Sequence, residues 1–301
     1  MPDYDYLWKT VISDLFEEFL LFFAPDLYEM VDFSHPPEHK EQEFHKIYPD
    51  AISKNREVDK LIGVKLKDGK EQWILIHIEI QGDREEDFPK RMFQYYYRIL
   101  DRYDQDLYTL AIYSDSSPTF KPDHYCTRFF GTELTYTYNT YKILDQNEKE
   151  LLQSRNPFAL AILAGLYLIK GKNHPIKKFE YKKGLVRLLF KEYDYPREKV
   201  EMLLVFIDHL LVLPEEESGK LAEEIYPFIE KEALEMGLSI EDTSFAKYYK
   251  KQGVEEGKNL GKVERSYEIA RNMVNEGFSV EVINKMTGIE KDEILKLIKR
   301  L

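Results

Sequence analysis

The stretch that most constrains the fold runs from Arg56 to Gln81, with the sequence REVDKLIGVKLKDGKEQWILIHIEIQ. In its second half, isoleucine alternates with Leu75, His77 and Glu79. Because strand side chains point alternately to opposite faces, one face is apolar and the other ends in polar groups. Asp68-Gly69 is a short-range hairpin signal between two strand-like runs. The stretch therefore predicts an antiparallel β-hairpin.

The length of the hairpin loop decides which acidic residues face each other. A three-residue loop from Asp68 to Lys70 sets Asp59 opposite Glu79, whereas a two-residue loop sets Asp59 opposite Ile78. Two facing carboxylates destabilise a sheet, and a Mg²⁺ ion, which takes carboxylate oxygens, would compensate. Gln81 projects from the same face as Glu79. Alternatively, these side chains lie on the solvated face of a two-sided sheet, and the pattern alone leaves both interpretations open.

The order of the elements around this hairpin adds a resemblance. An acidic amphipathic helix, Asp59, IHIEIQ with Glu79 and Gln81, and a helix beginning FPKRMFQYYYRI follow one another. This succession resembles the PD-(D/E)XK nuclease superfamily and, within it, the Rpn family of recombination-promoting nucleases and transposase-like proteins. The resemblance covers residues 1 to about 145 and implies an α/β (α+β) fold, a restriction-endonuclease-like mixed sheet flanked by helices. The general signature ends Glu-x-Lys, and Gln81 stands where the lysine would be.

The resemblance also implies an activity, which is Mg²⁺-dependent hydrolysis of phosphodiester bonds in DNA, with Mn²⁺ as a substitute metal. Asp59 and Glu79 are then expected to hold the metal together with the main-chain carbonyl of Ile80. Gln81 is expected to orient the attacking water or the phosphate. Glu17 of the first helix is carried over as a further catalytic acid, with a solvated helix face as the alternative. The implied setting is bacterial recombination, DNA mobility or defence.

The helix that follows the hairpin carries a stripe of basic and aromatic side chains. Arg91, Tyr95, Arg98 and Arg102 fall on one helix face. Such a stripe suits a phosphate backbone, so we expect Arg91, Tyr95 and Arg98 to bind DNA. The alternative is a helix whose arginines pair with nearby acidic residues and whose Tyr95 is a core residue.

Composition sets bounds on the class of protein. A chain of 301 residues with 43% hydrophobic content can form two domains, or one with an appendage, and is not disordered. The net charge of −12 argues against a general nucleic-acid coat protein. The single cysteine, Cys126, excludes an intramolecular disulfide and is expected to be a small buried or half-buried side chain. With no signal peptide and no apolar run of ~20 residues, we expect a cytoplasmic protein that does not enter membranes.

The remaining elements follow from periodicity and from proline and glycine positions. Helical spacing predicts a first helix over residues 7–23, ended by Pro25. A loop with His35, His39 and His45 leads into the hairpin, and zinc binding there is a minor alternative. Further strands are expected over 107–113 and 134–144, and further helices beginning near Pro89, Pro157, Lys177, Pro196 and Glu215.

These elements suggest three parts, a nuclease-like domain over residues 1–150, a helical domain over 151–250 and a small helical unit over 251–301. Gly253, Gly257 and Gly261 favour a flexible or lightly helical connector. The tail beyond it has the helix, glycine turn, helix layout of a helix-turn-helix, although such units also serve in oligomerisation. The mixed charges of EKDEILKLIKR give only weak support for base reading.

Two other classes of function remain open beside the nuclease. A nuclease-like fold could act as a DNA- or protein-binding module, with Gln81 marking lost chemistry. A homo-oligomeric scaffold could be driven by the helical C-terminal half. DNA is the partner that the nuclease interpretation requires.

Overall fold

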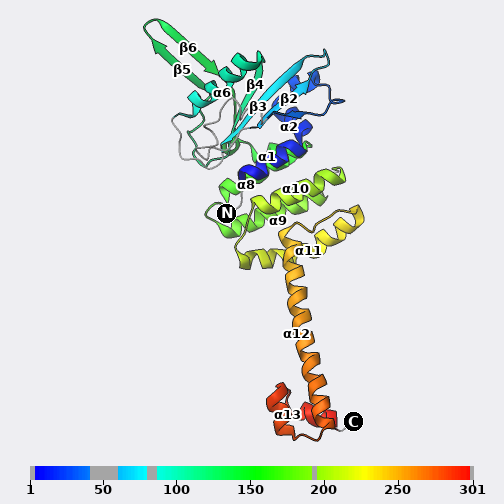
Figure 1. The fold of residues 1–301 in the computed structure, drawn as a ribbon. Coiled ribbons are helices and arrows are strands. Elements are labelled where there is room, and N and C mark those ends of the chain that lie inside the picture. The colour runs from blue at the N-terminus through cyan, green and yellow to red at the C-terminus, as the bar shows by residue number, and fades with distance from the viewer. Residues whose placement is uncertain (1–3, 41–59, 80–86, 192–194, 299–301) are drawn as a thin grey trace. The chain divides into compact units, whose positions relative to one another are not determined.

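The structure, a computed structural model, describes residues 4–40, 60–79, 87–191 and 195–298 (Figure 1). The chain divides into two compact units, Met1–Ser244 and Phe245–Leu301. In the described residues the first unit contains a mixed β-sheet and helices, and the second contains only helices. This arrangement confirms the predicted fold class. The proposed boundaries at residues 150 and 250 stay predictions.

The first unit is built around a five-stranded sheet with the order β1-β2-β3-β4-β7. Its strands are β1 (Glu38–His39), β2 (Lys60–Lys65), β3 (Glu71–Glu79), β4 (Leu107–Tyr113) and β7 (Asn139–Lys142). The pairs β1–β2 and β2–β3 are antiparallel, whereas β3–β4 and β4–β7 are parallel. Three neighbouring strands therefore end at the same edge of the sheet.

Helix α6 (Phe88–Tyr103) packs on one face of this sheet. The Phe88 ring lies 5.7 Å from the ring of Tyr113, at the end of β4. The Tyr103 ring lies 4.9 Å from Trp73, near the start of β3. Helix α6 thus runs opposite to the parallel strands, and its N-terminus lies beside their carboxyl ends.

The other face of the sheet is covered by the N-terminal helices. The expected single helix over 7–23 is wrong, because α1 (Tyr4–Asp14) and α2 (Phe16–Phe23) are separated at Leu15, whose backbone is not helical. The Phe23 ring lies 4.8 Å from the ring of Tyr141 in β7. On the two sides of the break, α1 contacts α10 (Arg197–Leu210), whereas α2 contacts α8 (Pro157–Lys170). Pro25 opens the short α3 (Pro25–Met30).

The hairpin of β2 and β3 is present, but its register differs from the expected one. Lys60 pairs with Ile76 and Lys65 with Glu71. The loop is therefore 67–69, closed by a hydrogen bond of 2.7 Å from the Leu66 amide to the Lys70 carbonyl. The loop over 68–70 and the register that set Asp59 opposite Glu79 are wrong for the described pairs. The shift is two residues, so each strand keeps the same residues on each face.

The expected strand over 134–144 is two separate strands. Strands β5 (His124–Phe129) and β6 (Thr132–Thr137) form a two-stranded hairpin of their own, and only β7 joins the main sheet. The chain changes sheet at Tyr138, whose amide donates to the Asp123 carbonyl at 3.0 Å. The Tyr138 ring is buried against Phe88, at 6.1 Å. Burial of this ring explains why the Thr/Tyr alternation does not continue as one strand.

The β5–β6 hairpin is exposed, and its turn holds an aromatic residue in an unfavourable backbone conformation. Phe130 has φ 42° and Gly131 has φ 83°. The Phe130 side chain is 93% exposed. Cys126 lies on β5 and is also exposed, so its expected burial is wrong. One face of the hairpin is half-buried, because the rings of Tyr125 and Tyr136 lie 5.4 and 5.8 Å from the Phe93 ring of α6. Cys126 follows Tyr125 in the strand and therefore lies on the opposite, exposed face.

Five helices complete the first unit in the described residues after β7. They are α7 (Glu148–Gln153), α8 (Pro157–Lys170), α9 (Pro175–Lys191), α10 (Arg197–Leu210) and α11 (Glu215–Met236). Helix α8 is almost entirely buried, and the side chain of Asn156 caps it by accepting from the Phe158 amide at 2.8 Å. The same side chain donates to the Glu18 carbonyl at 2.9 Å. Asn156 thus caps the N-terminus of α8 and links this helix to α2.

A buried ion pair fixes the end of this unit. Lys182 of α9 lies 2.7 Å from Asp208 of α10, and both side chains are at most 1% exposed. Asp208 also accepts from the amide and the hydroxyl of Ser244, each at 2.5 Å. Burial disfavours ionisation of the Asp208 carboxyl, but Lys182 and Ser244 outweigh it and hold the pKa of Asp208 below its usual value. The pair therefore stabilises α9, α10 and the residue at which the next helix begins.

Gly165 of α8 is expected to tolerate no side chain. A Cβ atom there would lie 2.8 Å from Trp8 Cζ2 and 3.3 Å from Ile143 Cδ1. Because Trp8 is only 1% exposed and cannot move aside, Gly165→Ala should lower the free energy of unfolding by about 1–3 kcal/mol. Urea unfolding can be followed by tryptophan fluorescence, since Trp8 and Trp73 are the only two tryptophans.

Gly184→Ala provides the matched control for this substitution. Gly184 lies within α9, is exposed and has nothing within 4 Å of an added Cβ. It should therefore raise the free energy of unfolding by about 0.5–1 kcal/mol through helix propensity. Equal effects of the two substitutions would contradict the close packing of Trp8 on α8.

The second unit consists of α12 (Ser244–Asn275), α13 (Val280–Thr287) and α14 (Lys291–Ile298). Its core contains Ala270, Ile283, Ile289 and Ile294. Of the two forms expected for the connector, the helical one is confirmed and the flexible one is wrong, because residues 253–261 lie within one continuous α12. Helix formation is cooperative, so long helical flanks carry glycines that each cost about 1 kcal/mol.

Candidate functional site

The candidate site lies at the edge where the three parallel strands end. Glu79 of β3 pairs in register with Tyr113 of β4, and Tyr113 pairs with Lys142 of β7. These three residues form one row across the sheet. Ligands of open α/β sheets bind beyond the carboxyl ends of the strands, so this edge is the place to look for chemistry.

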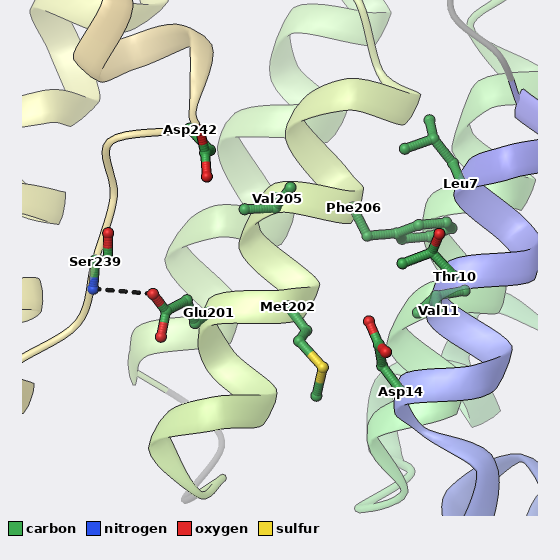
Figure 2. Close-up of a pocket in the computed structure, with 10 residues that line it drawn as sticks. All are labelled: Leu7, Thr10, Val11, Asp14, Glu201, Met202, Val205, Phe206, Ser239 and Asp242. Carbon is green, nitrogen blue, oxygen red and sulfur yellow. Dashed lines mark hydrogen bonds between the residues drawn. The ribbon is translucent and has the colours of Figure 1, made fainter.

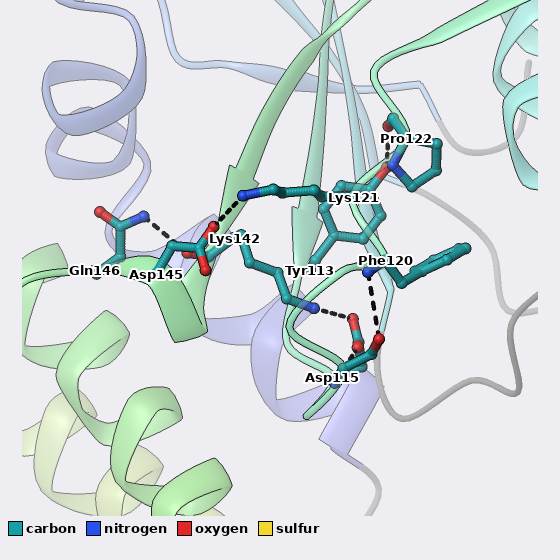
Figure 3. A network of polar contacts seen from close by, with 9 residues as sticks. Tyr113, Asp115, Phe120, Lys121, Pro122, Lys142, Asp145 and Gln146 are labelled. Carbon is teal, nitrogen blue, oxygen red and sulfur yellow. Dashed lines mark hydrogen bonds and ion pairs between the residues drawn. The ribbon is translucent and has the colours of Figure 1, made fainter.

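The described part of this edge is a network of polar contacts (Figure 3). Lys142 Nζ lies 2.5 Å from Asp115 Oδ2, and both residues are buried. The same ammonium group lies 5.7 Å from the centre of the Tyr113 ring. The Tyr113 hydroxyl donates to the Pro122 carbonyl at 2.5 Å. Lys142 is therefore a cation already neutralised by Asp115, and it fixes the ends of β4 and β7.

Arg91 lies near this edge on the first turns of α6. Its guanidinium carbon is 5.4 Å from the centre of the Phe88 ring, which contacts Tyr113. The Arg91 residue is only 7% exposed. The Arg91 guanidinium thus stacks on Phe88, and its positive charge lies near the carboxyl end of β4.

The other two residues of the expected DNA-binding stripe lie further along α6. Tyr95 is 2% exposed and belongs to the core between α6 and the sheet. Arg98 is half-buried and is two turns from Arg91, roughly 10 Å along the helix axis. Binding of DNA by Tyr95 and Arg98 stays a prediction. The buried position of Tyr95 agrees with the alternative that it is a core residue.

The carboxylates expected at the site are described only in part. Asp59, Ile80 and Gln81 lie outside the described residues, and Glu79 enters through its backbone register alone. Among the described side chains, no group of three or more His, Cys, Asp and Glu has the geometry to hold a metal. This includes His35 and His39, so the described part of the histidine loop gives no support for zinc.

The N-terminal helices place three acidic residues differently from one another. Glu17 of α2 is exposed. Its neighbour Glu18 forms an ion pair with Lys199 of α10. Asp14, at the end of α1, is also an exposed residue. Partial burial of its carboxyl nevertheless raises its pKa, and Lys60 partly opposes this shift.

Asp14 is an acidic residue near the hairpin that the sequence analysis did not name as a candidate. Its electrostatic neighbour Lys60 opens β2 and directly follows Asp59 in the chain. The break at Leu15 separates Asp14 from the helix that carries Glu17. A single helix over 7–23 therefore hid the difference between the two residues. The helix break at Leu15 would have distinguished Asp14 from Glu17, but no proline or glycine marks this break in the sequence.

A cavity of about 210 Å³ lies between α1 and α10 (Figure 2). Its walls include apolar side chains from both helices, such as Val11 and Phe206. Three carboxyl-bearing residues also line it, Asp14, Glu201 and Asp242. Glu201 accepts from the Ser239 amide at 3.1 Å, so that carboxylate is committed to the chain itself. The described residues that line the cavity include no histidine, cysteine or lysine.

The second unit has the geometry of a helix-turn-helix. Ser279 caps α13 by accepting from the Val282 amide. Gly288 ends α13 with φ 72°, a left-handed conformation that suits glycine. Helix α14 then begins at Lys291. The predicted short helices and glycine turn are confirmed, and the class that this unit defines is that of helix-turn-helix domains.

Comparison with known protein families agrees with this class and narrows it. Residues 263–299 match the C-terminal HTH domain of the Rpn/YhgA-like nuclease family. Residues 263–299 therefore resemble the C-terminal domain of the same family that the first half of the chain resembles, and this match supports the family resemblance. No curated protein and no solved structure matches the chain significantly.

This match suggests a nuclease-related function in a broad sense and DNA binding by the tail. None of the described helices is both long and apolar enough to cross a membrane.

Proposed function

We propose that this protein is a metal-dependent DNA endonuclease that hydrolyses phosphodiester bonds. The observation that carries the proposal is the position of Glu79, which ends β3 at the carboxyl edge of three parallel strands, in a chain with a nuclease-family tail. Carboxylates at such an edge can meet a phosphate from solvent. The proposed setting remains recombination, DNA mobility or defence.

The donor atoms of the proposed site suit Mg²⁺, with Mn²⁺ as a substitute. Asp59 and Glu79 offer carboxylate oxygens, and Ile80 offers a main-chain carbonyl, which are the hard ligands that Mg²⁺ prefers. When bound, the metal would lower the pKa of a water molecule and stabilise charge on the phosphate oxygens.

The other residues have supporting roles in this proposal. Gln81 would orient the attacking water or the phosphate through its amide. Glu17 or Asp14 would accept a proton through water, and Asp14 has the advantage of a raised pKa. Arg91 would attract phosphate electrostatically from behind the strand ends, since its burial limits direct contact.

The alternative function is a nuclease-like fold that binds DNA or protein without cleaving it. The residue that favours it is Gln81, because an amide cannot supply the positive charge of the general signature's lysine. Lys142 is a poor replacement for that charge, since Asp115 already neutralises it. Homo-oligomer formation stays a prediction under either function.

Plasmid nicking by the purified full chain separates the two functions. We expect conversion of supercoiled to nicked or linear DNA with Mg²⁺ or Mn²⁺, and none with EDTA, because the proposed nucleophile is a metal-activated water. Gel electrophoresis over a time course gives the rate. Absence of cleavage with every metal would reject the nuclease proposal and favour the binding module. Cleavage that persists in EDTA would reject the metal.

A further inference from the structure

The charge of the chain is divided unevenly between its two units. Residues 245–301 contain 12 Lys and Arg against 9 Asp and Glu, a net charge of +3. The whole chain has a net charge of −12, so residues 1–244 carry −15. A basic unit on an acidic chain indicates that polyanions are met through that unit.

The excess positive charge is concentrated on one face of α12. At 3.6 residues per turn, six basic residues fall within an arc of about 120° around the helix. No acidic residue between 247 and 265 shares that arc. All six are exposed. This basic face consists of Lys247, Lys250, Lys251, Lys258, Lys262 and Arg265.

The basic face places cations next to one another along the helix. Lys247 and Lys251, like Lys258 and Lys262, are i,i+4 pairs of like charge, which destabilise a helix by a few tenths of a kcal/mol each. The ion pair of Arg265 with Glu268 is long, at 3.7 Å, and exposed, so it contributes little. A helix face that carries cations and no acidic residue produces a local positive potential, which suits the binding of a polyanion.

The dimensions of the basic face suit a nucleic-acid duplex. From residue 247 to residue 265 the helix rises roughly 27 Å at 1.5 Å per residue. Duplex DNA presents a phosphate on each strand about every 3.4 Å along its axis. Long lysine side chains that are one or two turns apart can thus contact successive phosphates without reading bases.

We propose that this basic face of α12 binds the phosphate backbone of duplex DNA. The adjoining residues 263–299 match a helix-turn-helix domain, which places the same partner next to the face. Interfacial helices bind anionic membranes through a broad apolar face opposite their cations, so an anionic membrane is the competing partner that the test must separate from DNA. The inference rests on the proposed DNA partner, but not on cleavage.

The test measures DNA binding by the full chain without cleavage. Fluorescence anisotropy of a labelled duplex is recorded in EDTA between 50 and 200 mM NaCl, for the wild type and for K251Q/K258Q/K262Q. Each phosphate contact contributes about 0.9 to the slope of log K against log salt. The triple variant should therefore lose about 2.7 from that slope and bind more weakly at low salt. Glutamine keeps the helix propensity of lysine.

A second triple variant removes the same charge elsewhere. Lys172, Lys177 and Lys231 are exposed in the first unit, so K172Q/K177Q/K231Q should leave the slope unchanged. Equal slopes for the wild type and K251Q/K258Q/K262Q, or equal losses in both variants, would overturn the proposal. So would wild-type protein that binds phosphatidylglycerol vesicles but not DNA. Plasmid nicking in Mg²⁺ reports separately on the proposed nuclease activity.

Discussion

Glu79→Gln is expected to abolish metal-dependent plasmid cleavage, with a loss of more than about 100-fold. That factor is the upper end of the cost of removing a residue that merely supports a metal ligand. Glutamine has nearly the same size as glutamate and should preserve β3, but it lacks the negative charge that holds Mg²⁺. Initial nicking rates measure the loss of activity, and Mg²⁺ titrations of wild type and variant measure the loss of metal affinity.

Glu71→Gln is the matched control on the same strand. Glu71 begins β3, at the opposite end from Glu79, and accepts from Trp73 Nε1 at 2.6 Å. Its ion pair with Lys40, at 3.1 Å, is partly exposed. We therefore expect normal cleavage and a change in the free energy of unfolding below about 1 kcal/mol. Full activity in Glu79→Gln would move the active site elsewhere.

Lys182→Met should cause the largest loss of stability, about 3–5 kcal/mol, because it leaves the buried Asp208 carboxylate without its cation. Urea unfolding followed by tryptophan fluorescence measures the loss, since Trp8 and Trp73 both lie in the first unit. The double variant Lys182→Met/Asp208→Asn should recover a substantial part of it, because no charge is then buried. A loss below 1 kcal/mol in the single variant would contradict the buried pair.

The pH dependence provides a second readout of the same pair. In the wild type the pKa of Asp208 is lowered on folding. Its stabilisation is therefore present above the unfolded pKa of about 3.9 and is lost as the pH falls through the folded pKa. In Lys182→Met, burial without a cation should raise that pKa. Protonation then relieves the penalty, so the deficit relative to wild type should shrink as the pH is lowered from 7 toward 5.

The parts of the fold that were predictable from sequence are those set by local patterns. Asp68-Gly69 and the isoleucine alternation predicted the hairpin, and Gly288 predicted the turn of the helix-turn-helix. The hairpin register was not predictable, because Gly69 can serve either of two three-residue loops and only packing selects between them. The break at Leu15 is likewise a tertiary effect, since no residue there disfavours a helix.

The candidate site was predictable in its local part only. Glu79 could be named as a candidate because the alternation of isoleucine with polar residues places it at the end of a strand. The row that it forms with Tyr113 and Lys142 depends on two parallel pairings between segments far apart in sequence. The intervening β5–β6 hairpin hid the second pairing, because its Thr/Tyr alternation runs into β7 without a turn signal. The pairing of strands that are far apart in the chain therefore could not be predicted from local sequence patterns.

The exposed β5–β6 hairpin also contains a natural site for attaching a spectroscopic label. Cys126 is the only cysteine of the chain and is exposed on β5. A maleimide dye or a nitroxide spin label would therefore attach to the wild-type sequence at one position, four residues before the exposed Phe130 at the turn. Quenching or line broadening at that label would report directly whether the hairpin contacts a partner. No engineered cysteine, and no removal of a native one, is needed for the measurement.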